Sequence, residues 1–189
     1  FAPDVEGGTN PATDGLSVAD TEEIFSTEVG FKSELIPNRL RVNGTVYRFE
    51  VDGQQITAVG GEFNVATLLN ADKTEGYGLE ADINWAPSRN WMMTFGGSYN
   101  HTEIKDPDLA ITPCGGGCTV LDPIGANGAL VNGNALPHAP EWTFNGILDY
   151  RRPYATGSFI GSVDFGYSCD KQFFLYESEE FHSDSFELG

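Results

Sequence analysis

Four stretches of the chain alternate strictly between two faces, and each apolar face begins and ends in an aromatic residue. The stretches are residues 77–85, 91–99, 142–150 and 159–167. Their apolar faces consist of Tyr77, Leu79, Ala81, Ile83 and Trp85; Trp91, Met93, Phe95, Gly97 and Tyr99; Trp142, Phe144, Gly146, Leu148 and Tyr150; and Phe159, Gly161, Val163, Phe165 and Tyr167. These positions carry no charge, and the opposite faces are mostly polar or small. A period of two predicts β-strands, and the chain is therefore expected to be all-β.

The constant length of these apolar rows separates a lipid-facing sheet from a soluble core. Each row covers nine residues, and at about 3.3 Å per residue nine residues span roughly 27 Å. An outer-membrane barrel has an apolar band about 25 Å tall between two girdles of aromatic residues. We therefore expect two lipid-facing girdles, one formed by Trp85, Trp91, Tyr150 and Phe159 and the other by Tyr77, Tyr99, Trp142 and Tyr167.

The connections between the predicted strands alternate between short and long. An earlier hairpin places Val29, Phe31 and Leu35 opposite a second apolar row, which consists of Leu40, Val42, Gly44 and Val46. The short connections are residues 36–39, 86–90 and 151–158, and the long ones are about 52–73 and 101–141. Short periplasmic turns and long extracellular loops are typical of outer-membrane barrels. The prediction is an incomplete antiparallel transmembrane β-barrel of six strands, with a seventh beginning near Phe186.

Composition excludes several classes of protein. With Lys+Arg 10 against Asp+Glu 28, the formal net charge is -18. Nucleic acid binding needs basic patches, and the only local ones are residues 32–41 and Arg151-Arg152, so the charge argues against a nucleic-acid-binding protein.

No run of 18 apolar residues provides a transmembrane helix. Residues 1–14 lack the basic and apolar regions of a signal peptide, so we expect that export information was removed or that the chain starts within a longer protein.

Three further segments resemble one family of barrels. Residues 26–33, Ser-Thr-Glu-Val-Gly-Phe-Lys-Ser, look like its recurrent strand "E-x-G-x-K". Residues 70–80, with Asn70-Ala71, Gly76 and Glu80, resemble its "N-A, G, x-E" strand, which is followed here by the turn Trp85-Ala86-Pro87. Residues 136–140, Leu-Pro-His-Ala-Pro, resemble the "L-P-x-x-P" motif before a later strand. In this order and spacing they resemble the barrel of TonB-dependent receptors over nearly the whole chain.

The resemblance implies an active importer of the bacterial outer membrane rather than an enzyme. The family has 22 strands, an N-terminal plug and a TonB box, so residues 1–189 are expected to be a partial barrel domain from the C-terminal part, without the plug and the closing strands. The implied partners are outer-membrane lipid, the TonB energy-coupling complex through the missing N-terminal part, and a small nutrient. Ferric siderophores are the commonest ligands of the family, and no cofactor is implied.

Two other functions stay open on the sequence alone. A soluble or surface β-sheet binding protein would pack the apolar face on a second sheet, since alternation by itself does not distinguish core from lipid. A passive porin-like channel would share the barrel but lack a plug.

Few residues are candidates for chemistry. His101 and His138 are placed in or near the long loops and are the candidate ligand contacts, and His182 is placed similarly. Glu80 and Asp82 share a strand face, and we interpret them as part of a solvated lumen wall rather than as an acid/base pair. No catalytic residue and no metal site are predicted.

The cysteines predict one local disulfide. In Cys114-Gly115-Gly116-Gly117-Cys118 three glycines give the backbone enough freedom to bring the two sulfurs together. A disulfide suits an oxidising cell envelope, whereas the alternative is two unpaired thiols. Cys169 is then left without a partner in sequence and is interpreted as an incidental residue at a strand end.

We predict that mass spectrometry of the non-reduced protein will show Cys114 linked to Cys118. The three intervening glycines keep the closed loop short and unstrained. Alkylation of both thiols to completion without a reductant would contradict the pairing.

Overall fold

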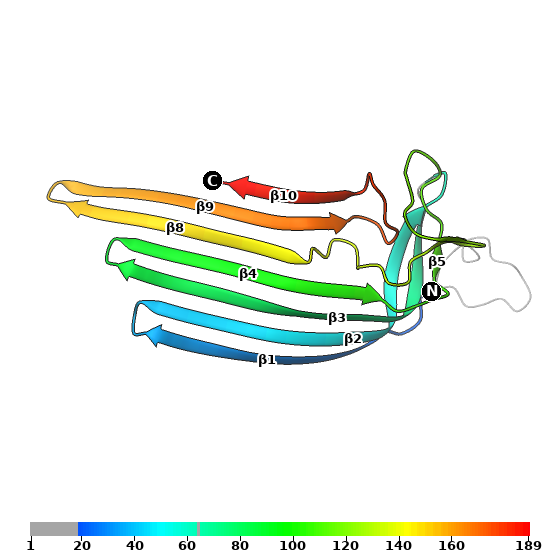
Figure 1. The fold of residues 1–189 in the computed structure, drawn as a ribbon, viewed down its shortest axis with the longest axis horizontal. Coiled ribbons are helices and arrows are strands. Elements are labelled where there is room, and N and C mark those ends of the chain that lie inside the picture. The colour runs from blue at the N-terminus through cyan, green and yellow to red at the C-terminus, as the bar shows by residue number, and fades with distance from the viewer. Residues whose placement is uncertain (1–18, 64) are drawn as a thin grey trace, which may run out of the picture.

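Seven long strands form one antiparallel sheet in the computed structural model, which describes residues 19–63 and 65–189. The expectation for residues 1–14 falls outside the described residues. The strands of the sheet, in spatial order, are β1 (Glu23–Ile36), β2 (Leu40–Gly60), β3 (Val65–Ser88), β4 (Trp91–Ile104), β8 (Trp142–Tyr154), β9 (Gly157–Gln172) and β10 (His182–Leu188). They lie side by side in an open, gently curved wall (Figure 1). The predicted all-β fold, an unclosed part of a barrel wall, is confirmed.

Strand pairing places the apolar rows on a single face. Ala81 pairs with Gly97, Tyr99 with Trp142, and Phe144 with Tyr167. The earlier hairpin joins the same face, since Gly44 pairs with Ala81 and the pairing of directly opposite residues keeps them on one side of a sheet. The register derived from alternation therefore holds across β1 to β9.

Aromatic side chains form a line at each end of this face. At the end near the long connections the Tyr77 and Tyr99 rings are 6.3 Å apart, and those of Tyr99 and Trp142 are 4.8 Å apart. At the end near the short turns the Trp91 and Tyr150 rings are 4.6 Å apart, with Phe159 6.1 Å from Tyr150. The predicted girdle residues thus lie in two rows, and that these rows meet lipid remains our proposal.

The turns at one end of the sheet are shorter than predicted. The β3–β4 turn is reduced to residues 89–90 and the β8–β9 turn to residues 155–156, because the strands continue past their aromatic ends. Only the β1–β2 turn, residues 37–39, has nearly its predicted length, and Asn38 there has a positive φ of 56°. Asn tolerates this left-handed conformation better than most residues.

The prediction of a long loop at residues 52–73 is wrong. β2 and β3 remain paired as far as Gly60 and Val65, so the segment is an extension of the hairpin. Gly53 has a φ of 64°, and beyond it the hairpin turns away from the direction of the sheet (Figure 1). Alternation of apolar residues continues in this segment, at Ile56, Ala58 and Leu69. The apolar row here does not begin and end in aromatic residues, so the sequence did not indicate paired strands.

The connection after β4 is partly structured. β4 extends to Ile104, and the loop contains β5 (Ala110–Ile111), β6 (Ile124–Gly125) and β7 (Gly128–Leu130) in a separate small sheet of order β5-β7-β6. The seventh long strand, β10, begins at His182 rather than near Phe186. The described residues contain no helix long and apolar enough to cross a membrane.

The lipid-facing assignment predicts that an arginine substitution costs very different amounts of folding free energy at two neighbouring positions of β3. Ala81 lies in the apolar row, and Asp82 lies on the other face, where it accepts a 2.9 Å hydrogen bond from Asn43. Ala81→Arg should cost about 2 to 4 kcal/mol of folding free energy near the bilayer midplane, and Asp82→Arg should cost far less. Folding of the complete parent barrel into lipid vesicles measures both, and equal costs would contradict the assignment of faces.

Candidate ligand-recognition surface

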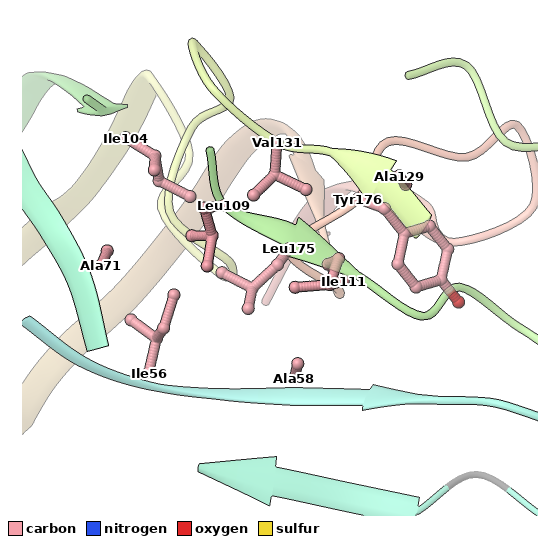
Figure 2. Close-up of a cluster of buried hydrophobic side chains, with 10 residues drawn as sticks. All are labelled: Ile56, Ala58, Ala71, Ile104, Leu109, Ile111, Ala129, Val131, Leu175 and Tyr176. Atoms are coloured by element: carbon pink, nitrogen blue, oxygen red, sulfur yellow. The ribbon is translucent and has the colours of Figure 1, made fainter. Parts of the chain in front are cut away.

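The buried apolar cluster of the described residues lies beyond the aromatic rows, at the end of the sheet with the long connections. Its members come from three connections and are Ile56, Ala58, Ala71, Ile104, Leu109, Ile111, Ala129, Val131, Leu175 and Tyr176. Figure 2 shows them pointing toward one another between the β2–β3 hairpin and the loop strands. Burying this much apolar surface gives the connections a core of their own, so they form one packed body. We call it the loop body.

Two buried polar side chains join the loop after β4 to the loop between β9 and β10. Asn134 donates to the Asp122 carboxylate at 2.9 Å and to the backbone carbonyl of Leu175 at 3.0 Å. Asp122 also accepts a 2.7 Å hydrogen bond from the backbone N–H of Glu177. A buried carboxylate is costly unless its oxygens are paired, and both oxygens of Asp122 are. The pair therefore fixes the relative position of the two loops.

A second contact between these loops is more exposed. The Glu180 carboxylate accepts hydrogen bonds from the backbone N–H and the hydroxyl of Thr119, at 2.8 and 3.0 Å, and from the Ser178 hydroxyl at 2.7 Å. These donors, with the Thr119 N–H first, lower the pKa of Glu180 because they favour its charged form. The carboxylate therefore stays ionised at neutral pH and holds the loop edges together.

Glycines allow the closest approach between the β2–β3 tip and the loop after β4. A Cβ atom at Gly60 would overlap the backbone carbonyl of Thr112, and the backbone N–H of Gly61 donates to the Pro113 carbonyl at 2.7 Å. The structure places a disulfide between Cys114 and Cys118 directly after this contact, with Cα atoms 6.4 Å apart. A backbone-to-backbone contact of this kind excludes any larger residue at Gly60.

The structure places the two candidate histidines differently. His101 is in β4 rather than in the loop, because the pairing of β4 with β3 continues beyond Tyr99 as far as Ile104. It pairs with Tyr77, and the two rings are 4.9 Å apart. Its ring nitrogens face Glu141 at 3.5 Å and Glu103 at 3.9 Å. It therefore lies on the face of the aromatic rows, at their edge.

His138 is in the loop, as predicted. It is exposed, has a φ of 59°, and donates its backbone N–H to Gln172 at 2.9 Å. Its ring lies 5.3 Å from that of Phe173. The third histidine, His182, begins β10 and hydrogen-bonds to Asp170 at 2.8 Å, which raises its pKa.

The wall opposite the apolar face is polar. A hollow of about 750 Å³ on it is lined by side chains that include Glu28, Lys32, Asn43, Glu80 and Asp82. Glu80 and Asp82 share this hollow with neutral polar groups such as Ser98 and Thr143, whose hydroxyls are 2.6 Å apart. Within residues 19–63 and 65–189, no group of three or more His, Cys, Asp or Glu side chains is arranged to hold a metal.

The sequence did not reveal two parts of the loop body. The extended β2–β3 hairpin was interpreted as a loop, and residues 173–181 received no role, although Leu175 and Tyr176 are buried there. The available signals were the alternation of Ile56 and Ala58 and the aromatic run Phe173-Phe174-Leu175-Tyr176. Neither specifies the cluster that these residues join, since its members come from segments as far apart as Ile56 and Tyr176.

Comparison with known proteins agrees with this architecture. The family model for the TonB dependent receptor-like β-barrel matches residues 2–185. A curated relative, the probable TonB-dependent siderophore receptor PiuA of Acinetobacter baumannii, is 22% identical over 134 residues, which cover 68% of this chain and 16% of the relative. The chain therefore spans about a sixth of that receptor.

Solved structures of three receptors have the same fold. The ferric yersiniabactin uptake receptor FyuA of Yersinia pestis gives a TM-score of 0.61 at 13% identity, over 88% of this chain and 21% of FyuA. The siderophore receptor PiuA of A. baumannii gives 0.56 at 15% identity, over 90% of this chain and 22% of PiuA. The ferric-catecholate import receptor Fiu of E. coli K12 gives 0.55 at 13%, over 93% and 23%. With a family model matching residues 2–185 and an aromatic-bounded open sheet of the same fold, this chain belongs to the TonB-dependent receptor β-barrel family of the bacterial outer membrane.

Proposed function

We propose that this chain forms part of the barrel wall and of the extracellular surface of an active outer-membrane importer. The observation that carries the proposal is the division of the molecule into an apolar sheet face, which has an aromatic row at each end, and a packed loop body beyond one of these rows. The wall suits lipid, and the loop body suits recognition, because loops held on a rigid scaffold commonly carry binding groups. Residues 1–189 are then a partial barrel domain of a longer receptor.

Family membership favours this function over the two alternatives. A soluble sheet would have to cover an apolar face on which Leu79, Phe159 and Val163 are exposed. A passive channel shares the wall but needs no energy coupling. The chain's family is one of receptors rather than enzymes, and the proposed partners are outer-membrane lipid and the TonB complex, which would be reached through parts of the receptor outside this chain.

A ferric siderophore is the proposed ligand. The names of the relatives support this choice, since FyuA takes up ferric yersiniabactin, Fiu imports ferric catecholates and PiuA is a siderophore receptor. Within the loop body, His138 is the stronger candidate contact. It is exposed in a loop, whereas His101 faces Tyr77, Glu103 and Glu141 at the edge of the apolar face.

Uptake measurements test the function. Cells that express the complete receptor should accumulate radioactive iron from at least one of a panel of ferric hydroxamate, catecholate and phenolate chelates. Deletion of TonB should abolish this accumulation, because active import requires coupling to the inner membrane. Uptake that persists without TonB would identify a passive pore, and failure to import any chelate would reject the siderophore proposal.

Shortening the loop after β4 should separate recognition from folding. In the complete receptor, replacement of residues 106–134 by a short Gly/Ser linker removes Leu109, Ile111 and Val131 from the loop body but no residue of the aromatic-bounded rows. We expect ligand affinity on whole cells to fall by about tenfold or more, the scale of losing a central contact, while heat-modifiable migration shows a folded barrel.

A matched control changes the opposite end of the sheet. Replacement of the turn residues Ala155 and Thr156 by Gly-Ser should leave ligand affinity unchanged.

His138→Ala should lower ligand affinity, as the shortened loop does, and His101→Ala should leave it unchanged. Unchanged affinity with a folded, shortened barrel would contradict a recognition role for this loop.

A further inference from the structure

A small cavity lies in the loop body between the tip of the β2–β3 hairpin and β5. Its volume is about 330 Å³, within the lower range of small-molecule pockets. The lining is mainly apolar and includes Ala58, Val65, Leu69, Ala110 and Ile111. Two hydroxyl-bearing residues, Thr67 and Thr112, also line it. This composition, an apolar surface with a few polar groups, is typical of sites for small organic molecules.

The cavity opens beside an exposed aromatic side chain. Phe63, at the hairpin tip, also lines the cavity and is 83% exposed. A Phe side chain left this open to water costs free energy that a ligand can recover by covering it. The walls are fixed on both sides, because Gly61 is hydrogen-bonded to Pro113 and Gly60 lies against Thr112. The site is therefore formed before any ligand arrives, which lowers the entropic cost of binding.

Charge around the cavity defines what it can accept. Of the described residues that line it, Glu62 is the only one with an ionisable side chain. Residues 49–76, 100–141 and 168–184, which include the loop body, each contain five Asp or Glu and a single Lys. Two of these lysines are already paired, Lys73 with Glu50 at 2.8 Å and Lys105 with Glu103 at 2.6 Å. The potential at this end of the sheet is therefore negative, which repels anions and attracts cations.

The turns at the other end of the sheet are rich in arginine. Its three turn segments, residues 36–41, 86–90 and 151–158, contain five arginines and no acidic residue. The end of the sheet that carries the cavity is therefore more acidic than the end with the short turns.

We propose that this cavity binds an aromatic ring of an uncharged or cationic small molecule and discriminates against an anionic one. Resting on the function proposed above, it is a subsite of the receptor for the organic part of the iron chelate. The ring packs between Val65, Leu69 and Ile111 and against Phe63, and Glu62 faces any positive charge the molecule carries.

Three fluorinated ring compounds, one cationic, one neutral and one anionic, test the site on the purified complete receptor. They are 4-fluorobenzylamine, 4-fluorobenzyl alcohol and 4-fluorobenzoate, followed by fluorine NMR line broadening. We expect the amine and the alcohol to bind and the benzoate to bind most weakly. Thr67→Trp should fill the cavity and weaken binding of the amine and the alcohol by about tenfold or more, the effect of blocking an apolar pocket.

The matched control is Thr57→Trp, the same substitution in the same hairpin. Thr57 pairs with Leu68, so it lies on the hairpin face opposite the one shared by Thr67 and Ala58, and it does not line the cavity. Binding should be unchanged in this variant, whereas the signal that remains in Thr67→Trp reports background binding to detergent. Glu62→Gln should reduce the preference for the amine over the alcohol by about two- to fivefold, the range of an exposed charge pair.

Each outcome decides the proposal. Binding that is equal in Thr67→Trp and Thr57→Trp, absent for all three compounds, or strongest for the benzoate overturns it. If the compounds bind at the cavity but the receptor imports no iron chelate, the site stands and the proposed function fails. If TonB-dependent import is observed and none of the compounds binds, the function stands and the subsite fails.

Discussion

Backbone pairing in a lipid environment is the constraint on which the rest of this structure depends. No water is available in a bilayer to satisfy an unpaired N–H or C=O group, so a strand that crosses must be hydrogen-bonded along its whole span. The pairing of β1 to β9 is continuous over the aromatic-bounded rows, and register shifts occur near the turns, between Glu34 and Ile36 and between Trp85 and Ser88. The long straight strands, the tight turns and the single apolar face all follow from that requirement.

The same constraint explains where the hydrophobic core lies. A single-layer wall with lipid on one side and polar groups on the other has nothing to bury between layers, so its apolar residues stay exposed in the isolated sheet. Burial begins only where the strands leave the membrane and the connections can fold over one another in water. Thr74, Ala71 and Ile104, all fully buried, mark that transition on β3 and β4.

Sequence predicted the wall well and the loop body poorly, for one physical reason. Alternation with aromatic ends is a local signal, and it located the cores of β3, β4, β8 and β9 with the correct facing residues. The loop body is held by non-local contacts, such as Asn134 with Leu175 and Gly60 with Thr112, and β5, β6 and β7 are two to three residues long, too short to show a period. His101 was misplaced for a related reason, because β4 continues beyond its last aromatic residue into the water-exposed region.

The shared core of the connections also affects how such a surface can be rebuilt. If each loop were independent, any one of them could be transplanted into another barrel on its own. Here a graft of the β2–β3 tip alone would carry Ile56 and Ala58 without the Ile111 and Leu175 side chains that cover them, and it would leave Gly60 without the Thr112 backbone that it fits. Transfer of the loop body to a new scaffold therefore requires all three connections as one block, and changes to it during evolution must be compensated across the block in the same way.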